Sequence, residues 1–113
     1  MSDCLFCKIV NGDIPADIVY KDEQVIVFKD ISPKAEVHLL MIPRLHIDSL
    51  NELSAEHGAL ISHMMLLLPK LAKDQGLEHG FRTIINTGKG GGQEVFHLHI
   101  HLMGGSKLPG FNN

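Results

Sequence analysis

Val95-Phe96-His97-Leu98-His99-Ile100-His101-Leu102-Met103 is the stretch that decides the fold of this chain. Polar and apolar residues alternate along it, which is typical of a β-strand with one buried face. Its leucines and isoleucine would then point into a core, and its three histidines would share the opposite face, about 7 Å apart. The run Gly88–Gly92 precedes it, and glycine-rich turns either present backbone N–H groups to phosphate or simply turn the chain. We therefore predict a strand over Val95–Met103 that carries a functional site.

Three histidines on one strand allow three interpretations. A metal ion could take at most two of them, because the row from His97 to His101 spans about 13 Å and cannot converge on one ion without a bend. Alternatively, one imidazole attacks a phosphorus atom while a neighbour handles the phosphate or a proton. A polar strand face without chemistry is the least favoured interpretation, because all three residues are titratable.

Charge repulsion along such a row of histidines favours neutral imidazoles, and a neutral imidazole can act as a nucleophile. Two imidazolium groups about 7 Å apart repel each other by roughly 2 kcal/mol at an effective dielectric near 20. This repulsion lowers the pKa of the second protonation by about one unit or more. At pH 7 the histidines should be mostly neutral, which leaves a ring nitrogen free to attack. A phosphorylated imidazole is readily hydrolysed, so the row suits a two-step transfer through a covalent intermediate.

Length and composition limit the class of protein. With 113 residues we expect one domain over residues 1–113, and the apolar fraction of 44% is typical of globular proteins. Ten Lys and Arg against 13 acidic residues leave a net charge of −3, which argues against a general binder of nucleic acid or anionic membranes. The longest apolar run, Met64–Leu68, is far shorter than a membrane span, and the N-terminus lacks signal-peptide features. We therefore expect a cytoplasmic protein with reduced thiols.

Cys4-Leu5-Phe6-Cys7 forms a C-x-x-C pair near the N-terminus. A disulfide is not expected in a reducing compartment, and no strand precedes the pair as a thioredoxin-like redox motif would require. Half of a zinc site and two ordinary thiols both remain open, and a zinc site would need two more ligands from elsewhere. We expect a short helix or turn here, with Phe6 and Ile9 packed on the core.

Four further β-rich runs predict the partners of the histidine strand. The first two are separated by a polar four-residue loop and predict an antiparallel hairpin. A proline stops the third, because it removes a ladder donor. The predicted strands are Asp17–Tyr20, Val25–Phe28, Val37–Pro43 and Phe81–Thr87.

One long helix is predicted between the third and fourth of these runs. Ser54 would be its N-cap, and the helix would run to about Gln75, where Gly76 closes it. Apolar residues recur along it at helical spacing and form a buried stripe. Three histidines show no partner pattern and are interpreted as solvated: His57, His63 and His79.

Taken with its flanks, the segment His97–Met103 resembles the histidine triad motif, His-φ-His-φ-His-φ-φ. The similarity extends over nearly the whole chain and is closest to the Hint branch, the histidine triad nucleotide-binding proteins, in a bacterial version. The other segments that follow the family's order are Asp30–Ala35, His38 with the strand into Pro43, His46-Ile47, Asn86, Gly91–Val95 and Gly104-Gly105.

The resemblance implies an α+β, HIT-like fold with an antiparallel sheet of about five strands, one long helix and a short N-terminal helix. It also implies a homodimer. Members of this branch hydrolyse purine nucleoside phosphoramidates, such as adenosine 5′-monophosphoramidate, to AMP and an amine. The expected partners are therefore a purine nucleotide substrate and a second copy of the chain, with no nucleic acid, no membrane and no organic cofactor.

The same resemblance assigns catalytic roles. His99 resembles the nucleophile that forms a covalent nucleotidyl-histidine intermediate. His101 would hydrogen-bond the phosphate, and His97 would support the leaving group or a proton relay with His38.

Nucleotide-binding positions follow in the same way. Asp30 resembles the residue that binds the ribose hydroxyls. The base would lie among Phe6, Ile9, Phe28 and Ile31. The phosphate-side positions are Asn86, Gly92, Glu94 and Val95, beside His99 and His101. Glu94 departs from the best-known pattern, in which a serine often contacts the phosphate or the leaving group.

A metal site is also implied. Several family members with this C-x-x-C pair hold zinc together with a histidine after the third strand and the first triad histidine. In this chain those ligands are Cys4, Cys7, His46 and His97, a set suited to a closed structural zinc site. His97 would then serve the metal, leaving the other two triad histidines for chemistry.

Three alternative functions remain compatible with the sequence. The chain could be a dinucleoside polyphosphate hydrolase or nucleotidyl transferase of the same family, although the Gly91–Glu94 run and the short length favour the Hint branch. It could be a non-catalytic nucleotide-binding or scaffold protein. A pure metal carrier would bind an ion at His99 and His101 without turnover.

Overall fold

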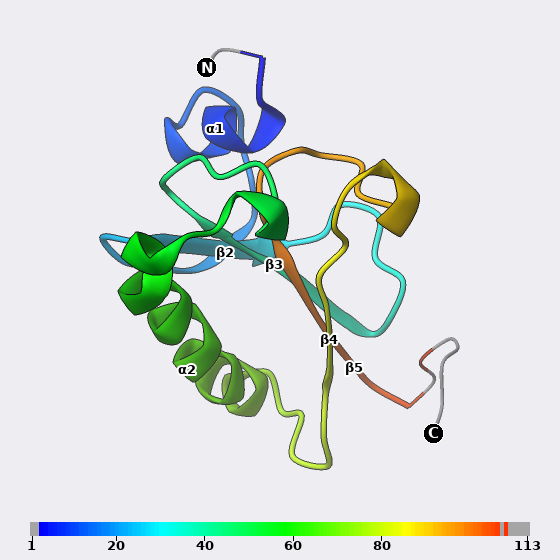
Figure 1. Cartoon of the computed structure of the whole chain (residues 1–113). Coiled ribbons are helices and arrows are strands. Elements are labelled where there is room, and N and C mark those ends of the chain that lie inside the picture. The colour runs from blue at the N-terminus through cyan, green and yellow to red at the C-terminus, as the bar shows by residue number, and fades with distance from the viewer. Residues whose placement is uncertain (1–2, 107, 109–113) are drawn as a thin grey trace.

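The computed structural model describes residues 3–106 and 108 and is built on a five-stranded antiparallel sheet (Figure 1). The strand order is β1-β2-β3-β5-β4. The strands are β1 Ile18–Lys21, β2 Val25–Lys29, β3 Val37–Pro43, β4 Arg82–Ile84 and β5 Ile100–Gly104. The helices are α1 Leu5–Val10 and α2 Gly58–Asp74, with 3-10 turns η1 Leu50–Glu52, η2 Ala55–His57 and η3 Lys89–Gly91. The predicted sheet with one long and one short helix is confirmed.

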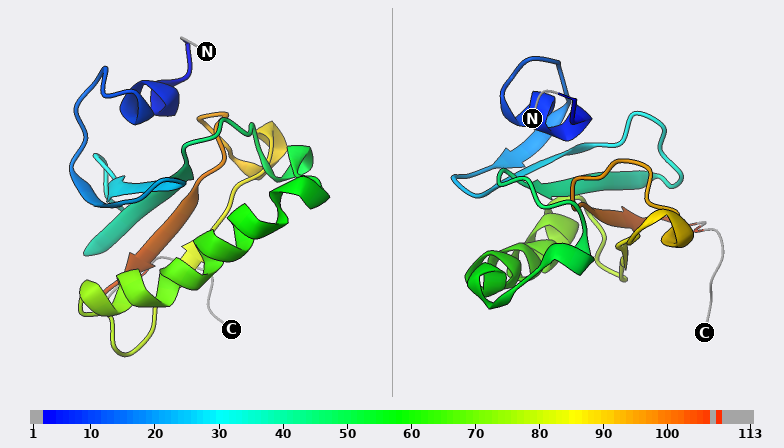
Figure 2. Two further views of the ribbon diagram at one scale, coloured as in Figure 1. Left: turned by 90° about the vertical axis from the view of Figure 1, so that its left-hand side faces the viewer. Right: turned by 45° about the horizontal axis from the view of Figure 1, so that its top comes forward.

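The two helices lie on opposite faces of the sheet (Figure 2). Because side chains alternate along a strand, β2 directs Val27 to one face and Phe28 to the other. Val27 belongs to the larger core, which α2 covers, and Phe28 to a smaller core with Phe6 and Ile9 of α1. Burying each such side chain contributes about 1.5–3 kcal/mol. None of the described helices is long and apolar enough to cross a membrane.

The pairing of β3 with β5 sets the face on which the histidines lie. Leu40 is opposite His101, and His38 is opposite Met103 in this ladder. His38 and His101 are therefore diagonal neighbours on one face of the sheet, within reach of each other's rings. Leu40 belongs to the smaller core, so this is the α1 face.

The predicted strand Val95–Met103 is wrong in its first half, because β5 begins only at Ile100. The preceding segment bonds to the loop that follows β3 instead of extending the ladder. The N–H of Leu98 donates to the carbonyl of Ile47 at 2.7 Å, and the His97 ring bonds to the carbonyl of Pro43 at 2.8 Å. The apolar residues are buried as predicted, but the histidines do not form a straight row. The fourth strand is likewise shorter than predicted, with β4 at Arg82–Ile84.

The long helix is confirmed in its main part. Ser54 caps η2, the 3-10 turn that leads into α2, and α2 itself starts at Gly58. At the other end Gly76 has φ +79°, and the N–H of Leu77 donates to the carbonyl of Ala72 at 2.9 Å. This is the left-handed ending that the glycine predicted.

The interpretation of His63 as a solvated residue is wrong. Its Nε2 lies 2.7 Å from Oδ2 of Asp22, which also accepts the Tyr20 hydroxyl at 2.7 Å. The backbone N–H groups of Gln24 and Val25 donate to the other carboxylate oxygen at 2.8 and 2.9 Å. Burial acts to raise the pKa of Asp22, but these hydrogen bonds outweigh it and hold the pKa well below its usual range. The carboxylate therefore ties α2 to the β1–β2 turn.

We predict that Asp22→Asn lowers the free energy of unfolding at pH 7 by roughly 2 kcal/mol, because several hydrogen bonds to a charged acceptor are lost or weakened. The folded-state pKa lies below the unfolded value of about 3.9, so this stabilisation is present above pH 4 and is lost as the pH falls below it. Urea unfolding at pH 7 and pH 3 measures both effects. The exposed Asp13→Asn is the control and should change stability by less than about 0.5 kcal/mol; an equal effect of the two variants would contradict the assignment.

Candidate active site

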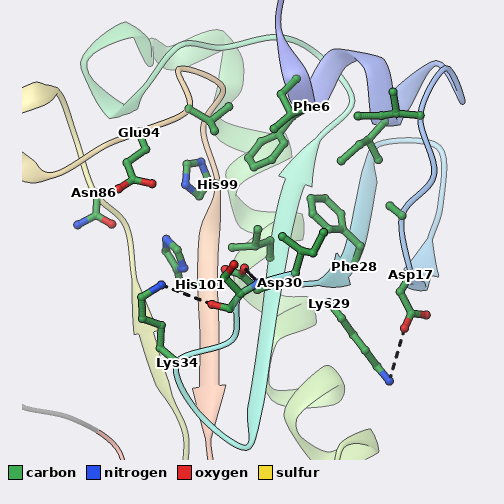
Figure 3. A pocket seen from close by; sticks show the side chains of 18 of the residues that line it. Phe6, Asp17, Phe28, Lys29, Asp30, Lys34, Asn86, Glu94, His99 and His101 are labelled. Atoms are coloured by element: carbon green, nitrogen blue, oxygen red, sulfur yellow. Dashed lines mark hydrogen bonds and ion pairs between the residues drawn. The ribbon is translucent and has the colours of Figure 1, made fainter.

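A cavity of about 1020 Å³ opens on the α1 face of the sheet, large enough for a nucleotide-sized ligand (Figure 3). The structure brings all eleven residues assigned to nucleotide binding into its wall. These are Phe6, Ile9, Phe28, Asp30, Ile31, Asn86, Gly92, Glu94, Val95, His99 and His101. The wall also contains residues for which no role was predicted, among them Ile14, Pro15, Ser32, Lys34 and Leu40.

One end of the cavity is an apolar slot. The rings of Phe6 and Phe28 meet edge to face, with centroids 5.5 Å apart, and both side chains are buried. Phe6 also packs edge-on against the His99 ring at 5.1 Å. Ile9 lines the slot from the next turn of α1. Such a slot suits a flat aromatic ring, because it offers apolar contact and almost no hydrogen-bonding groups.

The backbone fixes the protonation of His99. Its Nδ1 donates to the carbonyl oxygen of His97 at 2.7 Å, so in the neutral ring the proton is on Nδ1 and Nε2 keeps its lone pair. The side chain is only 7% exposed and lines the cavity. A neutral imidazole with an unprotonated nitrogen is the form needed for nucleophilic attack.

His38 fixes the opposite protonation of His101. The N–H of Lys34 donates to Nδ1 of His38 at 3.0 Å, so the proton of the neutral His38 ring is on Nε2. That Nε2 lies 2.9 Å from Nδ1 of His101 and donates to it. His101 must then carry its own proton on Nε2. The two neighbouring imidazoles, 5.1 Å apart between centroids, thus offer one lone pair at His99 and one N–H donor at His101.

Burial keeps this hydrogen-bond chain neutral. Burial lowers the pKa of His101 to about 4, with smaller effects from the neighbouring charges of His99 and His38. Burial also lowers the pKa of His38, although the Asp30 carboxylate acts in the opposite direction. Both rings are therefore uncharged at neutral pH, and the direction of the chain is set.

Asp30 stands where β2 ends and lines the cavity between the slot and the histidines (Figure 3). Its Oδ1 accepts the N–H of Ser32 at 2.8 Å, and its Oδ2 lies 3.4 Å from Nε2 of His38. An ionised carboxylate has about four acceptor positions, so capacity remains for hydroxyl donors of a ligand.

The end of the cavity away from the phenylalanines is lined by Asn86 and Glu94 (Figure 3), and Gly92 lies next to the Asn86 side chain. The Asn86 amide nitrogen donates to the carbonyl of Gly91 at 2.8 Å, which leaves its amide oxygen for other partners. Gly92 has φ +86°, a conformation that favours glycine. This end therefore presents acceptor oxygens, from an amide and a carboxylate.

Sequence reasoning missed the role of Gln93, which is buried beneath this loop. Its amide oxygen accepts the N–H of Gly88 at 2.8 Å, and its amide nitrogen donates to the carbonyls of Asp48 at 2.7 Å and Val95 at 3.0 Å. Gln93 thus holds the glycine-rich loop to the segment after β3. The local sequence gives no signal for this role, because the partner that ties the loop to the rest of the fold, Asp48, is 45 positions away.

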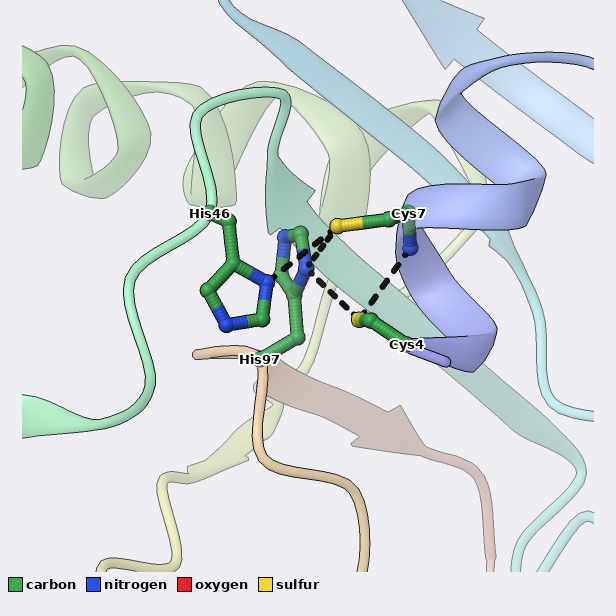
Figure 4. Close-up of side chains that lie close together, drawn as sticks. All are labelled: Cys4, Cys7, His46 and His97. Carbon is green, nitrogen blue, oxygen red and sulfur yellow. Dashed lines mark hydrogen bonds between the residues drawn. The ribbon is translucent and has the colours of Figure 1, made fainter. Parts of the chain in front are cut away.

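Cys4, Cys7, His46 and His97 lie together beside the cavity (Figure 4), with their ligand atoms all within 4.8 Å of one another. The Sγ of Cys4 is 3.4 Å from Nδ1 of His97, and the Sγ of Cys7 is 3.2 Å from Nδ1 of His46 and 3.6 Å from Nδ1 of His97. In a tetrahedral zinc site with bonds of about 2.3 Å to sulfur and 2.0 Å to nitrogen, sulfur and nitrogen are about 3.5 Å apart. The three sulfur–nitrogen distances match this spacing.

The histidines of this cluster are also held in the orientation that a metal requires. The Nε2 of His97 donates to the carbonyl of Pro43 at 2.8 Å, and the Nε2 of His46 donates to Asp48 Oδ1 at 2.7 Å. Both rings therefore turn an unprotonated Nδ1 toward the sulfurs, as metal-bound histidines typically do. Burial lowers the pKa of the His97 ring, which keeps it neutral.

The second role considered for His97, a proton relay with His38, does not match this geometry. His97 is directed to the cysteines and to Pro43, whereas the ring partner of His38 is His101. Asp30, His38 and His101 also cluster within 4.8 Å, but the 2.9 Å contact between the two rings is a direct hydrogen bond. We interpret this second group as a hydrogen-bond chain.

Comparison with known proteins identifies the family. Residues 3–113 match the family model described as scavenger mRNA decapping enzyme C-term binding. Protein HitA of Neisseria gonorrhoeae is 58% identical over 104 residues, covering 92% of this chain and 97% of that protein. The purine nucleoside phosphoramidase of Escherichia coli strain K12 is 46% identical over 107 residues, covering 94% and 90%. A histidine triad protein from Clostridium difficile superimposes with a TM-score of 0.92 at 44% identity, covering 99% and 98%.

The five-stranded sheet and the cavity on its α1 face define a protein that can hold a ligand against two adjacent imidazoles, His99 and His101. With these relatives and this structural match, the chain belongs to the histidine triad family.

Proposed function

We propose that this histidine triad protein hydrolyses purine nucleoside phosphoramidates through a nucleotidyl-histidine intermediate at His99. The observation that carries the proposal is the opposite hydrogen-bond polarity of two adjacent imidazoles. His99 has a free lone pair because its proton is held by a backbone carbonyl, and His101 has a free N–H because His38 donates to its other nitrogen. The 46% identical Escherichia coli relative, named as a purine nucleoside phosphoramidase, supports this substrate class.

The cavity suggests one direction for the substrate. The purine would lie in the slot of Phe6 and Phe28, and the ribose hydroxyls would donate to Asp30. The phosphate would then reach His99 and His101, with the leaving group toward the acceptor end of the cavity.

Two displacement steps complete the reaction. The Nε2 of His99 attacks the phosphorus, a nitrogen–phosphorus bond to the ring forms, and the bond to the amine breaks as the amine takes up a proton from solvent and leaves. The N–H of His101 donates to a non-bridging phosphate oxygen and stabilises the charge that develops there. Water then attacks the phosphorus and gives up a proton to solvent, the bond to His99 breaks and AMP is released. The carbonyl of His97 stabilises the His99 ring in each step by accepting its Nδ1–H.

The leaving-group end favours an amine over a polyphosphate. A leaving amine carries N–H donors that match the oxygens of Asn86 and Glu94. A second phosphate would instead bring anionic oxygens close to the Glu94 carboxylate, and like charges disfavour such a contact. This is why we place phosphoramidate hydrolysis ahead of dinucleoside polyphosphate hydrolysis.

Intact-protein mass spectrometry with adenosine 5′-monophosphoramidate tests the intermediate. We predict a transient adduct of one AMP moiety on the wild type and none on His99→Ala, whose rate of AMP release should fall at least about a thousandfold because the nucleophile is lost. His79→Ala, an exposed histidine outside the cavity, is the matched control and should behave as the wild type.

The same samples separate the alternatives. Faster cleavage of a diadenosine polyphosphate than of the phosphoramidate would favour the polyphosphate hydrolase. AMP binding without adduct or turnover would instead indicate a non-catalytic nucleotide-binding or scaffold protein.

We further propose one structural zinc ion per chain at Cys4, Cys7, His46 and His97. Zinc there would cross-link α1 to the segments that precede β5 and follow β3. The expected cytoplasmic location suits it, because thiols stay reduced there. The four ligands leave no open position, so the site is not expected to take part in the chemistry.

Elemental analysis of purified protein should find about one zinc per chain, and Cys7→Ser should retain little. Asp48→Asn should weaken zinc binding by about 10- to 100-fold, because it removes the partner of the His46 Nε2–H. Lys8→Gln, on the same helix but outside the cluster, should keep the full zinc content. Substoichiometric metal in protein grown and purified with zinc would contradict the site.

We also propose a homodimer. The described chain leaves apolar surface uncovered, with Leu66 on α2 76% exposed and Phe81, next to the edge strand β4, 39% exposed. Edge strands and exposed apolar residues are typical of surfaces that a partner covers. Sedimentation equilibrium should give twice the 12.5 kDa chain mass, and Leu66→Lys should shift the protein toward the monomer. A wild type that sediments as a monomer at micromolar concentration would exclude the dimer.

A further inference from the structure

We infer that the Cys4–Cys7–His46–His97 cluster and the nucleotide cavity are coupled, so that metal at the cluster tightens nucleotide binding and nucleotide tightens metal binding. The inference rests on the proposed nucleotide function and on the proposed zinc site. Three connections between the cluster and separate walls of the cavity carry it.

The first connection is α1. This helix has six residues, with Cys4 as its N-cap and Cys7 within it, and both thiols point from it toward His46 and His97 (Figure 4). Helices this short are not stable on their own, so α1 depends on what anchors it. Cys4 caps its N-terminus by accepting the N–H of Cys7 at 3.3 Å. Between them Phe6 reaches the slot, with its ring 6.0 Å from the His97 ring and 5.1 Å from the His99 ring.

The second connection is the backbone of His97. Its side chain belongs to the cluster, is fully buried and is held at both ring nitrogens. Its carbonyl accepts the Nδ1–H of His99 at 2.7 Å, and this bond orients the His99 ring. A shift of the His97 ring would therefore move the group that orients the proposed nucleophile.

The third connection runs through His46 to the glycine-rich loop. His46 donates to the Asp48 carboxylate at 2.7 Å, and the Asp48 carbonyl accepts from the buried amide of Gln93 at 2.7 Å. Gln93 in turn accepts the N–H of Gly88 at 2.8 Å. The loop that carries the phosphate and leaving-group end of the cavity is thus linked to the cluster through one buried side chain.

These connections imply that the coupling is positive, so that each ligand strengthens the binding of the other. Metal at the cluster would order α1, the His97 carbonyl and the glycine-rich loop before the nucleotide binds. The entropic cost of ordering these segments on nucleotide binding would therefore be smaller. Coupling between sites is reciprocal, and typical values are about 5- to 150-fold. We expect about a tenfold effect here, because three walls are affected while the floor, made by β2 and β3, is not.

The experiment titrates AMP into the full-length protein, zinc-loaded and after chelation, by isothermal calorimetry. The Kd for AMP should rise about tenfold without metal and recover when zinc is restored, and saturating AMP should tighten zinc binding by the same factor. Hydrogen exchange provides a readout independent of activity. The amides of residues 5–10 should exchange faster without metal, while those of β3 and β5 remain protected.

One variant and its control test the connection through α1. Phe6→Leu should keep its zinc affinity in the absence of AMP but show a smaller coupling factor, because it removes the contacts between α1 and the His99 ring. Lys8→Gln, on the same helix and outside both sites, should show the full coupling.

Equal AMP affinity with and without zinc would overturn the coupling while leaving the proposed function intact. Loss of protection throughout the sheet after chelation would also overturn it, because the metal would then support the whole fold. Failure of the zinc-loaded protein to bind AMP would instead refute the proposed nucleotide function, and the inference with it.

Discussion

His97 is held at three points, and the rest of the site depends on this restraint. One ring nitrogen bonds to the Pro43 carbonyl, the other faces two cysteine sulfurs, and the backbone carbonyl accepts the proton of His99. A side chain with no exposed surface and partners on both nitrogens has very little freedom. The carbonyl that sets the protonation of His99 is therefore fixed by residues about 50 and 90 positions away in the sequence.

Burial gives the neighbouring imidazoles their chemical difference. In water His99 and His101 would be equivalent side chains that exchange tautomers freely. In the protein His99 must donate to a carbonyl and His101 must accept from His38, so each has one available form. The pKa of His101, lowered by burial to about 4, keeps the His101 ring neutral over the physiological range. Two identical residues thus become an acceptor and a donor through their surroundings alone.

Alternation and hydrophobic periodicity were sufficient to predict the strands and the long helix, whereas the residues that line the cavity were predicted from the family resemblance. Leu98, Ile100 and Leu102 are buried because the period of two is a property of extended backbone. The start of β5 could not be predicted in this way. It depends on Leu98 bonding to Ile47 rather than to β3, a choice between partners that are equally compatible with the local pattern. The bond between His63 and Asp22 was missed for the same reason, since it joins a helix to a turn 41 residues away.

The sequence by itself determined which residue types are present and in what order: a C-x-x-C pair, alternate histidines, a glycine-rich run and two hydrophobic periodicities. Together with the family resemblance, these predicted the fold class and the set of site residues. Only the tertiary structure decided which motif histidines belong to which site. His97 faces the cysteines, and His99 and His101 line the cavity. The physical reason is that the tautomer and direction of an imidazole are set by hydrogen-bond partners in space, and those partners are brought together only when the chain folds.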